Sequence, residues 1–303
     1  ILRVSKTVDT AFRTAMKVFP VMGLIAVIML AFASALVKWQ VTRLIRPINR
    51  LDLENPLEDD VYEELTPLLQ STDKQNKEKD AVANMRKEFS ANASHELKTP
   101  LTSISGYAEI MKNGLVKPED MTGFAERIYN EASRLITLVE DIIKLSKLDE
   151  GNVELEKEEV DLYKLTREIL TRLSPQAAKR KVHVEVTGEP VEYVGIRQIL
   201  DEMIYNICEN AIKYNKEGGK LTVWVGNTLQ GKKICVTDTG IGIPENETDR
   251  IFERFYRVDK SHSKETGGTG LGLSIVKHGA MLHGAKIHVD SKLGEGTKIE
   301  LIF

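Results

Sequence analysis

A stretch of 19 residues without a charged side chain, Phe19–Val37, constrains the fold of this chain more than any other feature. As a helix rising 1.5 Å per residue it would extend about 28 Å, close to the ~30 Å hydrocarbon core of a bilayer. It lacks an A-x-A-like cleavage site after a short apolar core, which favours a membrane span over a signal peptide. The alternative is a buried helix in a soluble core. We therefore expect a transmembrane helix at 19–37.

The segments on either side of this span are less informative. Basic residues are equally frequent on both sides, so charge bias does not set the orientation: Arg3, Lys6, Arg13 and Lys17 precede the span, and Lys38, Arg43, Arg46 and Arg50 follow it. Residues 1–18 are compatible with the tail of a truncated domain, and a chain starting at Ile1 is expected to be a fragment or a processed form. Residues 38–77 contain three prolines and an acidic group, which makes them too broken for one long helix. They form either a signalling linker or a solvated, loosely helical connector.

The apolar pattern then predicts a helix at 78–112. Its stripe recurs in steps of three and four residues and comprises Val82, Met85, Phe89, Ala93, Leu97, Leu101, Ile104, Ala108 and Met111. His95 lies two residues from two members of the stripe, so its imidazole should point away from them. Pro100 cannot donate to the carbonyl of Glu96, so the helix should kink or loosen beside His95. A solvated histidine on an ordinary amphipathic helix is the simplest explanation for this residue alone.

A second helix is expected at 119–149, after the break made by Asn113-Gly114 and Pro118. Its apolar residues follow heptad-like steps, so the two helices should form an antiparallel hairpin. One hairpin does not cover both apolar stripes well, whereas a dimeric four-helix bundle would.

From about residue 158 the pattern changes to alternating helices and strands. We expect helices at 161–173, 194–214 and 270–283, and strands at 181–187, 221–228, 232–237, 285–290 and 297–302. The irregular stretch between Asp238 and Gly270 is long enough to be a lid or a binding segment. The net charge of −3 gives no bulk electrostatic argument for nucleic acid.

One stretch of this region suited to a nucleotide is the helical run NICENAIKYN at 206–215. Asn206, Asn210 and Lys213 share one face, and Tyr214 follows. An amide oxygen can ligate Mg²⁺, a lysine can meet phosphate, and a tyrosine can stack against a base. A solvated helix face is the simpler explanation of this stretch taken alone.

Two glycine-containing stretches have the same potential. In DTGIGI a strand ends at Asp238, whose carboxylate can accept a hydrogen bond from an exocyclic amine, while Gly240 and Gly242 let backbone approach a flat ring. In GGTGLGL at 267–273, glycines open a helix, where N–H groups and the positive dipole end favour phosphate. Either stretch alone is a weak signal, because glycine-rich turns are common, and the second fits neither a Walker A loop nor a Rossmann fingerprint.

Taken together and in this order, these stretches resemble the bacterial sensor histidine kinases of the orthodox two-component type. HELKTPL resembles the H box of that family, NICENAIKYN the N box, DTGIGI the G1 box, IFERFYRVD at 251–259 the F box, and GGTGLGLSIV the G2 box. The resemblance covers roughly residues 80–303. It implies a multidomain chain with the following parts: an extracytoplasmic stub at 1–18, one transmembrane helix at 19–37, a degenerate HAMP-like signalling linker at 38–77, a dimerisation and histidine phosphotransfer domain (the dimeric four-helix bundle) at 78–151, and an α/β sandwich ATP-binding domain of the histidine kinase/gyrase type at 158–303.

The resemblance also implies roles for the phosphotransfer residues. His95 would be the phosphoacceptor, and Glu96 would take or orient the imidazole proton. Thr99 would position water for dephosphorylation of the partner, and Arg257 would reach the γ-phosphate. Phe252 and Phe255 would anchor the lid.

The same resemblance implies a site for ATP and Mg²⁺. Asn210 would hold the metal with help from Asn206, Lys213 would neutralise phosphate charge, and Tyr214 would contact adenine. Asp238 would read the adenine amino group, with Gly242 beneath the ring. The nucleotide-binding residues implied in this way are Asn206, Asn210, Lys213, Tyr214, Asp238, Gly240, Gly242, Gly268, Gly270, Leu271 and Gly272.

The implied activity is ATP-dependent phosphorylation of His95, followed by transfer to an aspartate of a response regulator. The implied setting is a homodimer in the bacterial inner membrane with residues 38–303 in the cytoplasm and no direct contact with nucleic acid. Two rival functions are an ATP-driven conformational machine of the gyrase or chaperone type and a nucleotide-binding scaffold without transfer. The HELKTPL hairpin argues against the first, and the complete set of nucleotide residues argues against the second.

Overall fold

A computed structural model describes residues 2–49, 66–150, 156–258 and 268–303. The chain divides into two compact units, residues 1–87 and residues 88–303. Much of the predicted linker, at 50–65, lies outside the described residues, as do Asp259 of the predicted F box and Gly267 of the predicted G2 box.

The first unit contains the helix α1 (Leu2–Asn49) and the beginning of α2 (Thr66–Lys112). Within α1, the segment Met16–Arg43 has a mean hydropathy of 2.4 and none of its apolar window is buried, so by length and composition it can cross a membrane. This segment includes the predicted span at 19–37. The guanidinium of Arg43 lies 5.4 Å from the ring centre of Trp39, at the end of the span.

Both helices of this unit extend further than the sequence pattern predicts. Residues on both sides of the apolar stretch continue α1, and α2 begins at Thr66 rather than near residue 78. The early start has a simple cause, because Pro67 falls in the first turn, where a missing N–H breaks no intrahelical bond. The predicted start of this helix near residue 78 is therefore wrong, whereas the expectation that the linker is too broken for one long helix stays a prediction, because residues 50–65 lie outside the described ones.

The second unit opens with a helical hairpin made of α2 and α3 (Met121–Glu150), as predicted. Gly114 follows α2 with φ of +67°, a left-handed conformation that glycine adopts without strain. Its N–H donates to the carbonyl of Met111 at 3.1 Å, which satisfies one of the last helical carbonyls. A 3₁₀ turn at Pro118–Asp120 then leads into α3.

The rest of the unit is an α/β sandwich, which confirms the predicted fold class. Its sheet has the strand order β2-β4-β5-β7-β6, in which only the pair β2–β4 is parallel. A separate two-stranded sheet joins β1 to β3, both too short to show alternation in the sequence. The strands are β1 (Glu158–Asp161), β2 (His183–Gly188), β3 (Glu192–Gly195), β4 (Lys220–Thr228), β5 (Gly231–Asp238), β6 (Lys286–Lys292) and β7 (Gly296–Ile302).

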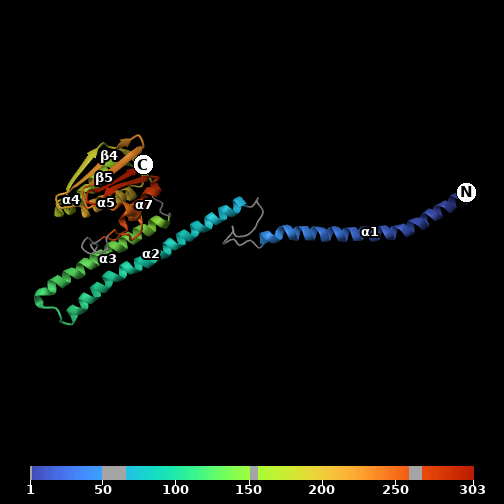
Figure 1. The fold of residues 1–303 in the computed structure, drawn as a ribbon, viewed down its shortest axis with the longest axis horizontal. Coiled ribbons are helices and arrows are strands. Elements are labelled where there is room, and N and C mark those ends of the chain that lie inside the picture. Colours follow the sequence, from blue (N-terminus) through green and yellow to red (C-terminus); the bar gives the residue numbers. More distant parts are fainter. Residues whose placement is uncertain (1, 50–65, 151–155, 259–267) are drawn as a thin grey trace. The chain divides into compact units, whose positions relative to one another are not determined.

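Three helices, α4 (Leu162–Lys179), α5 (Arg197–Lys213) and α7 (Gly272–His283), lie on one face of the five-stranded sheet (Figure 1). Alternate residues of the strands, such as Leu221, Val223 and Val225 of β4, are fully buried against these helices. The apolar face of each element therefore points into one core, which holds the polar edge of α5 and the start of α7 in fixed positions.

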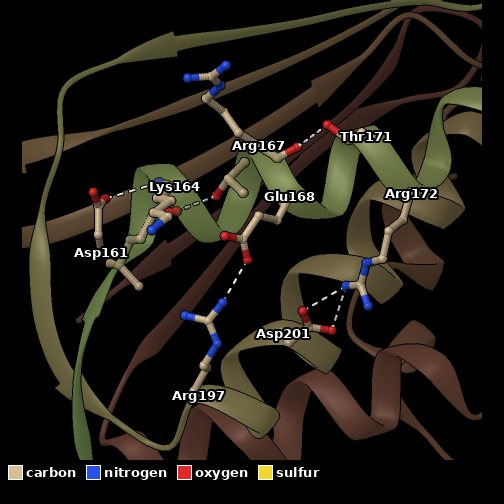
Figure 2. A network of polar contacts seen from close by, with 10 residues as sticks. Asp161, Lys164, Arg167, Glu168, Thr171, Arg172, Arg197 and Asp201 are labelled. Carbon is tan, nitrogen blue, oxygen red and sulfur yellow. Dashed lines mark hydrogen bonds and ion pairs between the residues drawn. The ribbon is translucent and has the colours of Figure 1, made fainter.

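Polar contacts connect the exposed sides of α4 and α5 (Figure 2). Asp161 caps α4 by accepting hydrogen bonds from the N–H groups of the second and third residues of the helix at 2.9 and 3.0 Å. Arg172 donates to both carboxylate oxygens of Asp201 at 2.7 Å, and Arg197 pairs with Glu168 at 2.7 Å. These contacts fix α4 against α5 on the solvent side of the core.

Candidate phosphotransfer site

His95 is exposed on α2, which confirms that its imidazole points away from the apolar stripe. It lines an open groove of about 460 Å³ together with Lys98, Thr99, Thr102 and Ser103. The hydroxyl of Thr99 donates to the carbonyl of His95 at 3.2 Å, one turn earlier. The α-helix runs without a break through Pro100. The kink predicted beside His95 stays a prediction, because a continuous helix can still bend at a proline; the ring of His95 is accessible.

Glu96, the residue after His95, lies between two arginines from different parts of the fold. Its Oε2 is 3.4 Å from Nη2 of Arg257 and 3.8 Å from Nη2 of Arg134 on α3. Arg257 is mostly buried, and its Nε has no hydrogen-bond partner among the described residues. Burial lowers the pKa of Arg257 below its usual range, and the nearby carboxylate of Glu96 opposes this shift.

The end of α5 carries the predicted polar face. The side-chain N–H of Asn206 donates to the carbonyl of Glu202 at 2.7 Å, which leaves its amide oxygen free to face the start of α7. Burial lowers the pKa of Lys213, whose Nζ lies 5.6 Å from the ring centre of Tyr214. Among the described residues, the side chain of Asn210 makes no hydrogen bond, so its amide oxygen remains available to a ligand.

Asp238 ends β5 as expected and is partly buried. Its Oδ1 accepts hydrogen bonds from the N–H of Gly240 at 2.8 Å and of Thr297 at 3.3 Å, and burial raises its pKa. Contacts within the protein already explain the glycines that follow. A Cβ at Gly240 would clash with the carbonyl oxygen of Tyr214. Gly242 has φ of +67°, and a Cβ there would lie even closer to the carbonyl oxygen of Lys292. The predicted contact of Gly242 with a flat ring stays a prediction.

The glycine-rich segment packs directly on the polar face of α5, as the joint prediction requires. A Cβ at Gly268 would lie 2.8 Å from Nζ of Lys213, and one at Gly272 would lie 2.5 Å from Oδ1 of Asn206. Gly270 has φ of +74°, and Leu271 is fully buried at the N-terminal end of α7. The close approach at Gly272 and the positive φ of Gly270 explain why these two positions are glycines.

The segment before the glycines reaches across to the helical hairpin. The ring of Phe255 lies 5.6 Å from the ring of Phe89 on α2, and the N–H of Phe255 donates to the carbonyl of Gly270 at 2.9 Å. Phe255 has φ of +64°, a strained backbone conformation for a bulky residue. Phe252 is partly buried in a 3₁₀ turn at Arg250–Phe252. The lid role predicted for both phenylalanines stays a prediction.

Three contacts at this site were not predicted from the sequence. They are the stacking of Phe89 on Phe255, the pairing of Arg134 with Glu96, and a hydrogen bond of 2.7 Å from the hydroxyl of Thr269 to Asp141 on α3. Phe89 stood on the predicted apolar stripe, which was a usable signal. Arg134 and Asp141 are ordinary charged residues of an amphipathic helix, and nothing in their spacing distinguishes them.

Comparisons with known proteins match two parts of the second unit. Residues 85–151 match the family of His kinase A (phospho-acceptor) domains, and residues 195–303 match the histidine kinase-, DNA gyrase B-, and HSP90-like ATPase family. Residues 195–303 therefore belong to an ATP-binding domain family.

Individual relatives agree with these matches. The sensor histidine kinase WalK of Bacillus subtilis (strain 168) is 37% identical over 235 residues, which cover 73% of this chain and 37% of WalK. The crystal structure of histidine kinase ThkA in complex with response regulator protein TrrA matches with a TM-score of 0.59 and 25% identity, covering 80% of this chain and 67% of that chain. Full-length ShkA in complex with AMPPNP matches with a TM-score of 0.52 and 26% identity, covering 71% of this chain and 45% of that chain. The chain thus spans little more than a third of the length of WalK.

Proposed function

Because the chain belongs to the bacterial sensor histidine kinases, carrying both a phospho-acceptor and an ATPase-type domain, we propose that it is an ATP-dependent protein-histidine kinase. It phosphorylates His95 and then donates the phosphoryl group to an aspartate of a response regulator. The α/β domain at 158–303 supplies the nucleotide, and the hairpin at 78–151 supplies the acceptor and the homodimer interface.

The contact between Arg257 and Glu96 is the observation that carries this proposal. These two residues are 161 positions apart in the sequence, yet their side chains lie 3.4 Å apart, next to the exposed His95. A cation from the nucleotide-binding domain therefore pairs with the residue that follows the proposed acceptor histidine in the helix. Phosphoryl transfer depends mainly on positioning and on neutralisation of charge, which is what such a cation provides.

In the proposed reaction a ring nitrogen of neutral His95 attacks the γ-phosphorus. The new N–P bond forms as the bond to the bridging oxygen breaks, and ADP leaves with that oxygen. Glu96 takes or orients the proton on the other ring nitrogen. Arg257 and Lys213 neutralise the phosphate oxygens. Thr99 would position water when the regulator is dephosphorylated.

The nucleotide residues suit ATP with Mg²⁺. The amide oxygen of Asn210 fits a hard cation and would hold Mg²⁺, which would neutralise charge on the phosphates. Asp238 keeps Oδ2 available for an adenine amino group, because Oδ1 accepts both of its backbone hydrogen bonds. The backbone at Gly268, Gly270, Leu271 and Gly272 offers N–H groups to the phosphates at the start of α7.

We further propose that α1 anchors the protein in the bacterial inner membrane. Residues 38–303 would then be cytoplasmic, because the kinase needs access to ATP, and residues 1–18 would be the extracytoplasmic stub. Several apolar side chains of the hairpin are exposed, including Leu101, Tyr129 and Ile136. A second copy would cover these side chains in a four-helix bundle.

The deciding experiment uses the whole chain in detergent micelles with γ-labelled ATP and Mg²⁺, beside the variant His95→Gln. Acid-labile, alkali-stable label in the parent and none in the variant is the expected result. Label retained in the variant would refute His95 as the acceptor. ATP turnover without any label would favour the conformational ATPase.

A further variant, Thr99→Ala, tests the dephosphorylation role. It should autophosphorylate at the parental rate and remove phosphate from the regulator more slowly. An unchanged removal rate would reject that role for Thr99.

A further inference from the structure

A single carboxylate oxygen receives two cations beside the acceptor histidine. Oε2 of Glu96 is the nearest carboxylate atom both to Arg257, at 3.4 Å, and to Arg134, at 3.8 Å. The side chains of Arg257, Arg134 and Glu96 are 12%, 19% and 31% exposed, so water screens these pairs only in part. The two guanidinium groups therefore compete for the same atom.

The two arginines differ in what holds them. Arg134 lies on α3, so it belongs to the same hairpin as His95 and Glu96. Arg257 lies on the irregular segment that follows β5 and leads to the glycines. Movement of the nucleotide domain against the hairpin would therefore carry Arg257 away from Glu96 and leave Arg134 in place.

The surroundings of Arg257 disfavour its charge, and the carboxylate of Glu96 opposes this effect. Burial is the main cause of the lowered pKa values of both Arg257 and Lys213, and the charge of Arg134 lowers both further. Three cations, Arg134, Arg257 and Lys213, thus repel one another across this site, and the carboxylates of Glu96 and Glu209 offset only part of the repulsion, which favours the arrival of another anion. A terminal phosphate that took Arg257 would relieve this repulsion but would leave Glu96 with one partner.

We infer that Arg134 is a positioning residue for phosphoryl transfer, holding the carboxylate of Glu96 beside His95 when Arg257 moves to the terminal phosphate of the nucleotide. This inference rests on the proposed function. In the transfer itself, Glu96 must face the imidazole proton while the N–P bond forms and ADP leaves. Arg134 holds the carboxylate of Glu96 in place during that step through the ion pair between their side chains.

The test compares Arg134→Gln with Arg127→Gln in the whole chain, by the rate of labelling from γ-labelled ATP. Arg127 is the matched control, because it lies on the same helix and its guanidinium stacks on Tyr107 and Phe124 rather than on Glu96. Arg134→Gln should lower kcat by about tenfold or more. This decrease is smaller than the full rate enhancement that a positioned proton acceptor contributes, because Glu96 itself is still present. Its KM for ATP should stay within about twofold of the parent, since the nucleotide contacts are unchanged. Arg127→Gln should change neither.

Two further variants separate positioning from folding and from direct contact with phosphate. Arg134→Lys keeps the charge and should recover part of the lost kcat. In a double-mutant cycle, Arg134→Gln should have little further effect when Glu96→Gln is already present. An equal further loss in that background, or a rise in KM without loss of kcat, would overturn the inference. If the parent is labelled normally and Arg134→Gln is labelled at the same rate, the role of Arg134 is refuted and the proposed kinase activity stands. If the parent is never labelled, the proposed kinase activity itself is refuted.

Discussion

The second unit contains two apolar clusters that differ greatly in size and composition. The large cluster lies between the five-stranded sheet and α4, α5 and α7, and it contains 26 buried residues. The small cluster contains four buried residues, Leu138 and Leu145 of α3 together with Leu271 and Ile275. Partly buried side chains surround it, including Phe89 and Phe255. One cluster belongs to a single domain, and the other joins the hairpin to the nucleotide domain.

Because of this difference in size, the packing within the α/β domain is stable, whereas the contact between the hairpin and the nucleotide domain can open. Apolar stabilisation grows with the area removed from water, so the large cluster holds the α/β domain together under all conditions. The small cluster contributes a few side chains at most, and such contacts open locally at a much lower free energy than the whole domain. The kinase that we propose would bring a nucleotide to His95 and then release the hairpin to a regulator, and it would need that second kind of contact.

The largest effect is expected for Leu200→Ala, in the middle of the large cluster. Leu200 is fully buried on α5, so truncation removes apolar burial and leaves a cavity. We expect the free energy of unfolding of the α/β domain to fall by about 2–5 kcal/mol. Urea denaturation followed by far-UV circular dichroism measures it. A loss below about 1 kcal/mol would mean that the cluster can collapse around the gap and is less rigid than its packing indicates.

A smaller and more local effect is expected for Phe89→Ala, which removes one side of the aromatic pair with Phe255. Phe89 is only partly buried, so we expect the free energy that docks the hairpin on the nucleotide domain to fall by about 1–2 kcal/mol. The loss comes from the buried apolar area and from the contact between the two rings. Hydrogen exchange should increase at 250–258 and 268–275 and stay unchanged in the strands. The matched control is Phe124→Ala, whose ring meets Tyr107 near the turn of the hairpin and not the nucleotide domain. Faster exchange throughout the sheet would show that the two clusters are not separable.

The packing within each domain could be predicted from the sequence, whereas the contacts between the two domains could not. Local periodicity was sufficient for the hairpin, the order of helices and strands, and the exposed face of His95. The sequence also predicted that Asn206 and Lys213 lie near the glycine-rich segment, because each of the two stretches contains its own recognisable motif. For the contacts between the hairpin and the nucleotide domain, the sequence marks single residues such as Phe89 as apolar but does not give their partners. These contacts join residues far apart in the chain, 128 positions in the case of Thr269 and Asp141, and depend on how two finished domains dock.

Helix ends and short strands were missed for local reasons. The sequence pattern predicts too late a start for α2, because proline usually interrupts a helix, whereas Pro67 lies in the first turn, where it is compatible with one. Likewise α4 continues past Pro175 to Lys179. The strands β1 and β3 have four residues each, too few to display a period of two.

The polar contact of the docking region is tested by Thr269→Val. Its hydroxyl donates to Asp141, whose pKa is raised by burial, and the hydrogen bond opposes that shift. Removing the donor should lower the free energy of docking between the hairpin and the nucleotide domain by about 1 kcal/mol. Hydrogen exchange at 268–275 should increase. In contrast, Asp141→Asn keeps an acceptor oxygen and removes a partly buried charge, so it should leave exchange unchanged. Equal effects of the two variants would show that the charge of Asp141, and not the hydrogen bond, holds the domains together.

The smallest effect is expected for Arg172→Gln, which breaks a well-formed polar contact within the α/β domain (Figure 2). Arg172 donates to both oxygens of Asp201 at 2.7 Å, but its side chain is 53% exposed, so water and salt screen the pair. We expect a loss below about 1 kcal/mol in the free energy of unfolding. A double-mutant cycle with Asp201→Asn isolates the pair from other changes, and Arg197→Gln, which breaks the neighbouring pair with Glu168, serves as the comparison. A coupling energy as large as the loss from Leu200→Ala would mean that polar contacts between α4 and α5, rather than buried apolar area, set the stability of the domain. The contrast between the two clusters would then lose its physical basis, because the number of buried side chains would no longer determine which contact opens first.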